Sequence, residues 1–408
     1  MPRPPHRVAA SAGALVWLLC CAPAHAQTGS LTLQAAIDRA LSANPTVASA
    51  RLRGAIDSAT LALARERLNP EVAIEFERET PRQAFGVAVP LELGGKRTRR
   101  IAVGEAAILV GQAEIAATIA QVRNDVRRAY YGVLAADARL MLLREIRDLS
   151  GRARDTAQAR FDAGDAPRLE VLQAELALAA AENEATAAEG TAVAARALLN
   201  SLLAFPLDTV QPLAGPIDAG GSVSTPQALE VAQRDSTELA VLDRQIGEQR
   251  ARLALAQALR VTDVTPTFSL TRDAQPEFSY GWRAGAAITV PLFTTHKAGV
   301  LVEQTTLDQL AALREATMAR ITGQVAAASV TVEAQRQLYV RYRDQVLPQA
   351  QQVEQLAQDS YQLGQTGIAA LLQALQASRD VRLRSLDAVQ QFQNALADLE
   401  RSIGAPLP

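Results

Sequence analysis

The chain has 408 residues with 41 basic and 43 acidic side chains, a formal net charge of −2. This near balance gives no general attraction to nucleic acid, so no nucleic-acid partner is expected. The chain contains only two cysteines and three histidines, and aromatic residues make up 4% of it. We therefore predict no disulfide framework, no metal site, no cofactor and no Ser-His-Asp triad, and we expect the protein not to be an enzyme.

The first 26 residues have the pattern of a secretory signal peptide. Arg3 and Arg7 precede an apolar run at 8–19, and Ala24-His25-Ala26 provides an A-x-A cleavage site. Both cysteines precede this site, so the exported chain is expected to lack them. Beyond it we find no uncharged apolar run of about 18 residues, the minimum for a membrane-spanning helix. Any membrane crossing is therefore expected to use strands.

The remainder of the chain repeats one pattern. Residues 160–174 (RFDAGDAPRLEVLQA) match residues 360–374 (SYQLGQTGIAALLQA) without a gap. A repeat of about half the chain is much longer than a solenoid unit and indicates a duplicated domain half. We predict a first repeat at 27–206, a Pro- and Gly-rich linker at 207–224, and a second repeat at 225–408.

Each repeat is expected to begin with a helix. Thr32 and Thr225 are suitable helix caps because a hydroxyl can accept hydrogen bonds from first-turn amides. Ala-rich sequence of helical character follows to about Leu68 in the first repeat and about Val261 in the second, with LALA at 61–64 and again at 253–256.

A period of two residues then indicates strands in each repeat. Apolar and small or polar residues alternate at 70–80 and 84–91, and again at 267–271 and 280–290. This alternation is typical of membrane β-barrel strands, which place apolar side chains toward lipid. Tyr280 and Trp282 begin the last strand and suit a membrane interface. The alternative at this point is two soluble hairpins packed on the helices.

A very long helix follows the strands of each repeat. Residues 96–164 and 297–364 have helical character throughout, and at 1.5 Å rise per residue each would be about 100 Å long. Pro348 is expected to interrupt the second one. The returning helices, at 168–204 and 368–404, are about half as long, so the helices that precede the strands would stack end to end on them. The first long helix contains a four-three apolar seam typical of a coiled coil, formed by Ile115, Ile119, Val122, Val126, Ala129, Val133, Ala136, Leu140 and Leu143.

Four strands per chain cannot close a membrane barrel, and open strand edges are excluded in lipid. Three copies would supply twelve strands and a matching ring of helices. We therefore predict a mainly α fold with a small β part. In it, long antiparallel coiled-coil helices form an α-barrel, and four strands per chain contribute to a 12-stranded membrane β-barrel of a homotrimer.

The motifs together resemble the TolC-like outer-membrane efflux proteins, which are trimeric channel-tunnels. The resemblance rests on LTLQAAIDRALSANP at 31–45, the two repeated motifs FDAGDAPRLEVLQA and YQLGQTGIAALLQA, and the strand exits VPLELGGKR and VPLFTTHK. The wording VPLELGGKR is most similar to the CzcC-like cobalt-zinc-cadmium components. The resemblance implies an outer-membrane exit duct in a Gram-negative bacterium, extending into the periplasm. Its implied partners are a periplasmic adaptor (membrane fusion) protein and a proton-driven inner-membrane pump of the RND class, and its implied cargo is heavy-metal cations.

The resemblance also implies roles for single residues. The periplasmic tips that meet the adaptor would be formed by Gly164, Asp165, Gly364 and Gln365. Glu170, with Arg168 nearby, would form a pore constriction. The second repeat departs from the family pattern, because Ala370 and Gln373 occupy positions that are acidic in some relatives.

The stretch LELGGKRTRR at 91–100 is expected to join the strands to the long helix. It is not a phosphate-binding loop, because the position of that motif's first glycine is occupied by Pro90 and the hydroxyl position by Arg97. Positive charge at a helix start opposes the macrodipole, so another benefit is expected. We predict contact with lipid phosphates, or with acidic residues of a neighbouring subunit, for the joint residues Lys96, Arg97, Arg99, Arg100 and the matched Lys297. His296, the neighbour of Lys297, is expected to be an exposed polar residue.

Two alternative functions remain open from the sequence. The first is a duct of the same fold for drugs, dyes or type I polypeptide secretion. The second is a periplasmic coiled-coil scaffold without a pore.

Overall fold

A computed structural model describes residues 30–405 apart from 80, 219, 222, 223, 275, 277 and 291. The predicted signal peptide therefore lies outside the described residues. The elements of the first half are α1 (Leu33–Ala43), α2 (Pro45–Arg65), β1 (Glu71–Phe76), β2 (Gln83–Ala88), α3 (Lys96–Asp162) and α4 (Arg168–Leu203). Those of the second half are α5 (Thr225–Asp235), α6 (Thr237–Ala258), β3 (Val264–Ala274), β4 (Phe278–Ile288), α7 (Lys297–Arg341), the π-helical turn η1 (Tyr342–Val346), α8 (Leu347–Gln362) and α9 (Ile368–Ile403).

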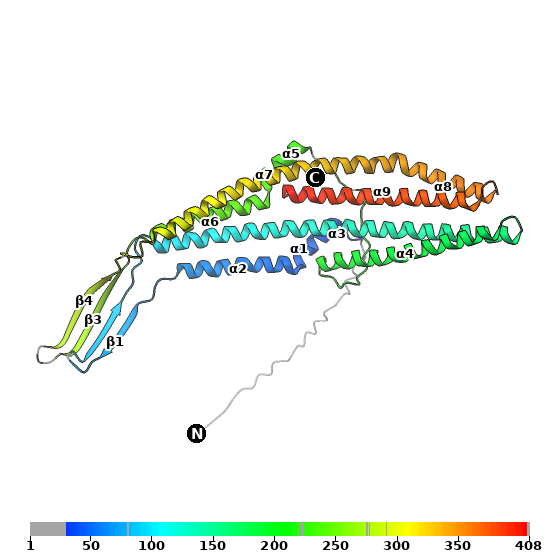
Figure 1. The fold of residues 1–408 in the computed structure, drawn as a ribbon. Coiled ribbons are helices and arrows are strands. Elements are labelled where there is room, and N and C mark those ends of the chain that lie inside the picture. Colours follow the sequence, from blue (N-terminus) through cyan, green and yellow to red (C-terminus); the bar gives the residue numbers. More distant parts are fainter. Residues whose placement is uncertain are drawn as a thin grey trace, which may run out of the picture.

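The molecule is elongated, with the sheet at one end and two helical hairpin tips at the other (Figure 1). The first long helix has 67 residues. It packs on α2 near the sheet and on α4 toward its tip, and α6 and α9 accompany the second long helix in the same way. The predicted arrangement, in which each long helix runs beside two stacked short ones, is confirmed.

The helical segment before each β-hairpin is divided into two helices, which the sequence analysis did not predict. Asn44 separates α1 from α2: its side chain accepts a hydrogen bond from the Thr46 N–H (2.8 Å) and donates one to the Leu202 carbonyl (2.9 Å). The next residue is a proline at the first helical position, where its missing N–H costs nothing. Ser236 separates α5 from α6 in the second half.

The two predicted helix caps have different outcomes. The Thr32 hydroxyl accepts a hydrogen bond from the Ala35 N–H at 3.2 Å, so the first cap is confirmed. Thr225 is wrong as a cap, because it is already the first residue of α5 and Ser224 occupies the capping position. Pro226 is the second residue of α5. Backbone N–H groups in the first turn have no intrahelical partner, so a proline, which lacks the N–H, is tolerated there.

The four strands form one antiparallel sheet in the order β1-β2-β3-β4. One face carries two rows of directly paired side chains, and directly paired residues share a face. The rows are Ile74, Phe85, Leu270 and Trp282, and Val72, Val87, Phe268 and Ala284. All of these side chains are exposed. The sheet projects beyond the helices (Figure 1), so the alternative of hairpins packed on helices is wrong.

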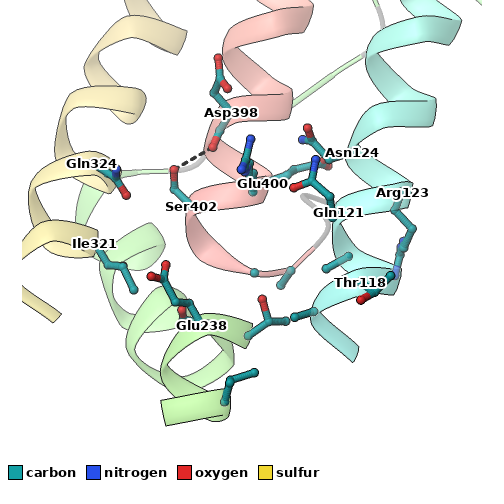
Figure 2. A pocket seen from close by; sticks show the side chains of 18 of the residues that line it. Thr118, Gln121, Arg123, Asn124, Glu238, Ile321, Gln324, Asp398, Glu400 and Ser402 are labelled. Carbon is teal, nitrogen blue, oxygen red and sulfur yellow. Dashed lines mark hydrogen bonds between the residues drawn. The ribbon is translucent and has the colours of Figure 1, made fainter. Parts of the chain in front are cut away.

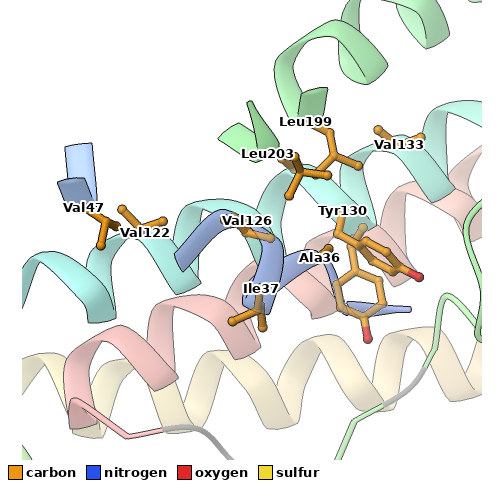
Figure 3. Packing of buried hydrophobic residues seen from close by; sticks show 12 residues of the cluster. Ala36, Ile37, Val47, Val122, Val126, Tyr130, Val133, Leu199 and Leu203 are labelled. Atoms are coloured by element: carbon orange, nitrogen blue, oxygen red, sulfur yellow. The ribbon is translucent and has the colours of Figure 1, made fainter. Parts of the chain in front are cut away.

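A compact core lies at mid-height, where the helix seam predicted from the sequence meets α1 and α4 (Figure 3). Val126 and Val133 of the seam are fully buried there. Tyr130 is also buried, and its hydroxyl lies 2.7 Å from the Leu31 carbonyl oxygen and accepts a hydrogen bond from the Ala214 N–H. This contact fixes the linker to the first long helix.

The second long helix is interrupted where the sequence predicted. The π-helical turn η1 ends at Val346, two residues before Pro348, which is the second residue of α8. A proline cannot donate to the preceding turn, and its ring clashes with the carbonyl four residues earlier, so the helix widens there. Tyr339, one turn before η1, donates a hydrogen bond to Asp218 of the linker at 2.6 Å.

One helix is long and apolar enough to cross a membrane by length and composition, although it has no uncharged apolar run of about 18 residues. An 18-residue window within α3 has mean hydropathy 1.4 and enough length to cross a membrane. This is weak evidence for a span, because length and composition alone satisfy the criterion. The helix is also much longer than the roughly 20 residues that a bilayer requires.

Candidate functional site

The joint between the sheet and the helices is organised around one buried lysine. Lys96, the first residue of α3, is only 7% exposed, and its Nζ lies 2.7 Å from Oδ2 of Asp263. The other carboxylate oxygen of Asp263 accepts a hydrogen bond from the Leu93 N–H at 2.9 Å. Asp263 directly precedes β3, so this contact ties the second repeat to the first.

The pKa of Asp263 reflects these contacts. Partial burial raises it, but the hydrogen bonds from Lys96 and the Leu93 N–H, together with the positive charge of Lys96, outweigh burial. The pKa of Asp263 therefore lies below its ordinary value, and the carboxylate is ionised at neutral pH.

The arginines of the joint satisfy the last carbonyls of α2. Arg97 donates two hydrogen bonds to the Arg65 carbonyl, at 2.6 and 3.1 Å. Arg100 donates to the carbonyls of Ala64 (3.1 Å) and Glu66 (3.0 Å) and also forms an ion pair with Glu92. The C-terminal carbonyls of a helix have no intrahelical partner and carry partial negative charge, so guanidinium groups stabilise them.

These contacts change the interpretation of the basic joint. Lys96, Arg97 and Arg100 all bind groups of their own chain, and Lys96 is too deeply buried to reach a lipid phosphate. The carbonyl groups at the end of α2 offset the positive charge at the start of α3. The sequence analysis considered α3 alone and therefore missed this contact. Arg99 and Lys297 are exposed. For those two, contact with lipid or with a neighbouring subunit stays a prediction.

The two hairpin tips have the same backbone geometry. Gly164 has φ +84° and Gly364 has φ +69°, a left-handed conformation that glycine adopts without steric cost. In the first tip the Asp165 N–H donates to the Arg160 carbonyl (2.8 Å), and in the second the Gln365 N–H donates to the Ser360 carbonyl (2.8 Å). These are the six-to-one bonds of Schellman motifs. All four predicted tip residues are exposed at the end of the molecule, and adaptor docking there stays a prediction.

Glu170 lies between the two hairpins rather than on a free surface of the single chain. One carboxylate oxygen is 3.3 Å from the Tyr361 hydroxyl and 3.8 Å from Nη1 of Arg160. The Arg160 guanidinium also stacks over the Tyr361 ring at 4.9 Å. Burial raises the pKa of Tyr361, and the charge of Glu170 raises it further against the effect of Arg160. A pore constriction formed by Glu170 and the exposed Arg168 stays a prediction.

Tyr361 and Arg160 were not singled out from the sequence. The available signal was the repeat itself. Tyr361 occupies the position that Phe161 has in the first repeat, and of these two matched residues only Tyr361 carries a hydroxyl. A polar atom added at a buried repeat position points to a hydrogen-bond partner on the other hairpin.

Ion pairs continue along the contact between the two hairpins. Among the residues of α9 that pair with the first helical hairpin, the basic ones lie toward the tip and the acidic ones toward mid-height, and their partners have the opposite order. The pairs are Arg379–Glu184, Arg382–Glu145, Asp387–Arg139, Asp398–Arg128 and Glu400–Arg127. Because the sign reverses along α9, sliding one hairpin against the other would place like charges together, so the ladder specifies the register.

A cavity of about 1240 Å³ opens at mid-height between α3, α6, α7 and α9 (Figure 2). Its acidic residues are largely paired: Glu238 with Arg320, and Asp398 and Glu400 with arginines of α3. Nowhere in the described ranges do three His, Cys, Asp or Glu residues gather in a way that could hold a metal ion.

Of the two predicted interface aromatics, Trp282 lies within the apolar face of the sheet and Tyr280 lies next to it along β4. Trp282 belongs to one of the apolar rows, and Tyr280 pairs with Arg272, whose guanidinium lies 5.7 Å from the Tyr280 ring centre. Both side chains are 72% exposed. A position at the membrane interface stays a prediction for both.

Comparison with known proteins identifies the class. Residues 36–204 match the family model of outer membrane efflux proteins. Crystal structures of CusC have the same fold, with a TM-score of 0.77 over 92% of this chain and 93% of that chain at 16% identity. The open-state outer membrane channel MtrE of Neisseria gonorrhoeae superposes with a TM-score of 0.75 over 92% of this chain and 89% of that chain at 20% identity. The family match over residues 36–204 and the shared fold are those of outer-membrane efflux channels.

Within that class, the chain is similar to a characterised relative. It is 25% identical, over 92% of its own length and 90% of the relative's, to the cobalt-zinc-cadmium resistance protein CzcC of Cupriavidus metallidurans. The resemblance to the TolC-like family and its CzcC-like branch, noted from the sequence motifs, is thereby confirmed. Members of this class are transport ducts, in line with the expectation of a protein that is not an enzyme.

Proposed function

We propose that this protein is the outer-membrane exit duct of a tripartite efflux system that exports heavy-metal cations. It acts with a periplasmic adaptor and a proton-driven RND pump. The observation that supports the metal cargo is the match to CzcC along nearly the whole of both chains.

The proposed duct is a homotrimer. One chain supplies four strands with two open edges, and unpaired backbone groups are not tolerated in lipid. Three copies supply twelve strands, and the exposed apolar rows of the sheet then face the hydrocarbon. The pump provides the energy, and the duct provides a continuous path across the periplasm and the outer membrane.

Metal tolerance of a deletion strain tests the cargo. Loss of the gene is expected to sensitise cells to zinc, cadmium and cobalt and to leave tolerance of a dye panel unchanged, with recovery on complementation. Unchanged metal tolerance together with dye sensitivity would show instead a duct for drugs or dyes. Loss of secretion of a polypeptide without either phenotype would support the type I secretion alternative.

Fractionation tests the outer-membrane location and separates the duct from a scaffold without a pore. The protein is expected in the outer-membrane fraction as an oligomer that dissociates on heating in detergent. The variant Leu270→Arg places a charge in the middle of the apolar sheet face and is expected to reduce insertion, because an arginine on a lipid-facing strand position costs about 2–4 kcal/mol near the bilayer centre. Recovery of the wild-type protein in the aqueous periplasmic extract would contradict the proposal.

A further inference from the structure

The helices near the sheet form a row with two open ends. α2 packs on α3, α3 on α6, and α6 on α7, so α2 and α7 lie at opposite ends of the row. The sheet has two open edges on the same two sides, because its edge strands are β1, which follows α2, and β4, which precedes α7. Each open edge therefore runs continuously over a strand and a helix.

Both helical edges expose apolar side chains, as a stripe on α2 and as an adjacent pair on α7. On α2 the side chains of Leu52, Ile56 and Leu63 are more than half exposed, and their spacing places them on one helix face. On α7 the side chains of Leu301 and Val302 are also more than half exposed. Contiguous apolar faces of this kind mark sites of association.

The contact between α3 and α6 inside the chain provides a template for covering these edges. There the start of a long helix meets the connection between a short helix and its strand, and Lys96 binds Asp263. The repeat places Lys297 at the same position as Lys96, at the start of α7. The residues before them also match in conformation: Gly95 has φ 71° and ψ 21°, and His296 has φ 53° and ψ 10°.

Lys297 has the geometry of Lys96 without its partner. It is exposed, and within the described part of the chain it makes no hydrogen bond or ion pair. Aligning the LALA segments of the two repeats places Asp263 opposite Glu71, and aligning the helix ends places it opposite Pro70. Of these two adjacent positions only Glu71 carries a carboxylate. Glu71 is likewise exposed, and its side chain makes no hydrogen bond or ion pair with the described residues.

We propose that Lys297 of one copy pairs with Glu71 of a second copy, so that the seam between subunits repeats the Lys96–Asp263 contact found within each chain. The α7 and β4 edge of one copy then covers the α2 and β1 edge of the next. This inference rests on the proposed oligomeric duct and adds its register: opposite charges at the joint align the strands and the helices of neighbouring subunits together.

Disulfide trapping in outer membranes tests this pairing, because the only cysteines of the chain are Cys20 and Cys21 in the predicted signal peptide. The variant Lys297→Cys/Glu71→Cys is expected to give reducible dimers and trimers after mild oxidation. Lys96→Cys/Asp263→Cys is the positive control and should close within one chain without multimers. Lys297→Cys/Glu77→Cys, with the second cysteine beyond the far end of β1, is the matched negative control.

A charge exchange gives a second readout. Lys297→Glu is expected to lower the temperature at which the oligomer dissociates in detergent, and Lys297→Glu/Glu71→Lys is expected to restore it. The absence of cross-linked multimers and of charge rescue, in a protein that is still oligomeric in the outer membrane, would overturn the pairing and leave the duct intact. A wild-type protein that is monomeric and periplasmic would overturn the proposed function as well.

Discussion

Replacing Asp263 by alanine is expected to destabilise the joint between the sheet and the helices. The change removes the acceptor of the Leu93 N–H and leaves the buried Lys96 ammonium without its carboxylate. A neutral hydrogen bond contributes about 1 kcal/mol and one to a charged group about 1.5–3 kcal/mol. Because the Asp263 side chain is 41% exposed, water replaces part of both hydrogen bonds in the variant. We expect the free energy of unfolding to fall by about 2 kcal/mol.

The assay is the thermal midpoint of the purified protein in detergent, followed by circular dichroism. For a chain of this size, a loss of that magnitude lowers the midpoint by about 2–3 °C. Asp208→Ala is the matched control, because Asp208 is exposed and its side chain makes no hydrogen bond or ion pair with the described residues. A double variant with Lys96→Met should lose less than the sum of the single changes, since the buried charge is removed too.

The effect of Asp263→Ala should also depend on pH. A carboxyl group whose pKa is lowered by folding contributes stability above its unfolded pKa, and that stability is lost as the pH falls through the folded value. The difference between the wild type and the variant is therefore expected at pH 7 and should shrink below about pH 4. Equal midpoints for Asp263→Ala and Asp208→Ala at pH 7 would refute the reasoning.

Three further changes test other contacts. Gly364→Ala should lower the free energy of unfolding by about 1–2 kcal/mol, because an L side chain is strained at φ +69°. Its control, Gly323→Ala in the middle of α7, should be neutral or stabilising. Equal thermal midpoints for the two variants would contradict this reasoning. Tyr339→Phe removes the bond to Asp218 and should cost about 1 kcal/mol. Burial and Asp218 raise the pKa of Tyr339 to about 12, so that cost should be constant from pH 6 to 9 and vanish only when the hydroxyl ionises. Arg100→Met should leave carbonyls of α2 unsatisfied and speed hydrogen exchange in its last turn; unchanged exchange would show that water satisfies them equally well.

The sequence predicted the features that depend on periodicity and repetition. Alternation over 280–290 indicated β4, and the repeated glycines at 164 and 364 indicated both tips. The boundaries that it missed depend on local side-chain chemistry. Asn44 divides α1 from α2 by bonding to α4, a partner about 160 residues away, and no local pattern reveals that contact.

The candidate site was predictable only in part for the same reason. The positive cluster at 96–100 was visible, but its partners come from other elements: Asp263 lies 167 residues further along the chain, and the carbonyls at the end of α2 have no sequence signal at all. Glu170 was visible as an acidic residue at a tip, whereas its contact with Tyr361 depends on how the two hairpins pack.

The central pair of the sheet has a consequence for how the protein is made. β2 and β3 pair directly, Gln83 with Arg272 and Ala88 with Thr267, although about 180 residues separate them. Closing so long a loop is slow, because its entropy is lost before the paired strands stabilise it. We therefore expect the first β-hairpin, formed by β1 and β2, to keep an exposed apolar face and an unpaired edge until β3 has also been made. A chain in that state needs protection, because an unpaired strand edge can pair with another chain.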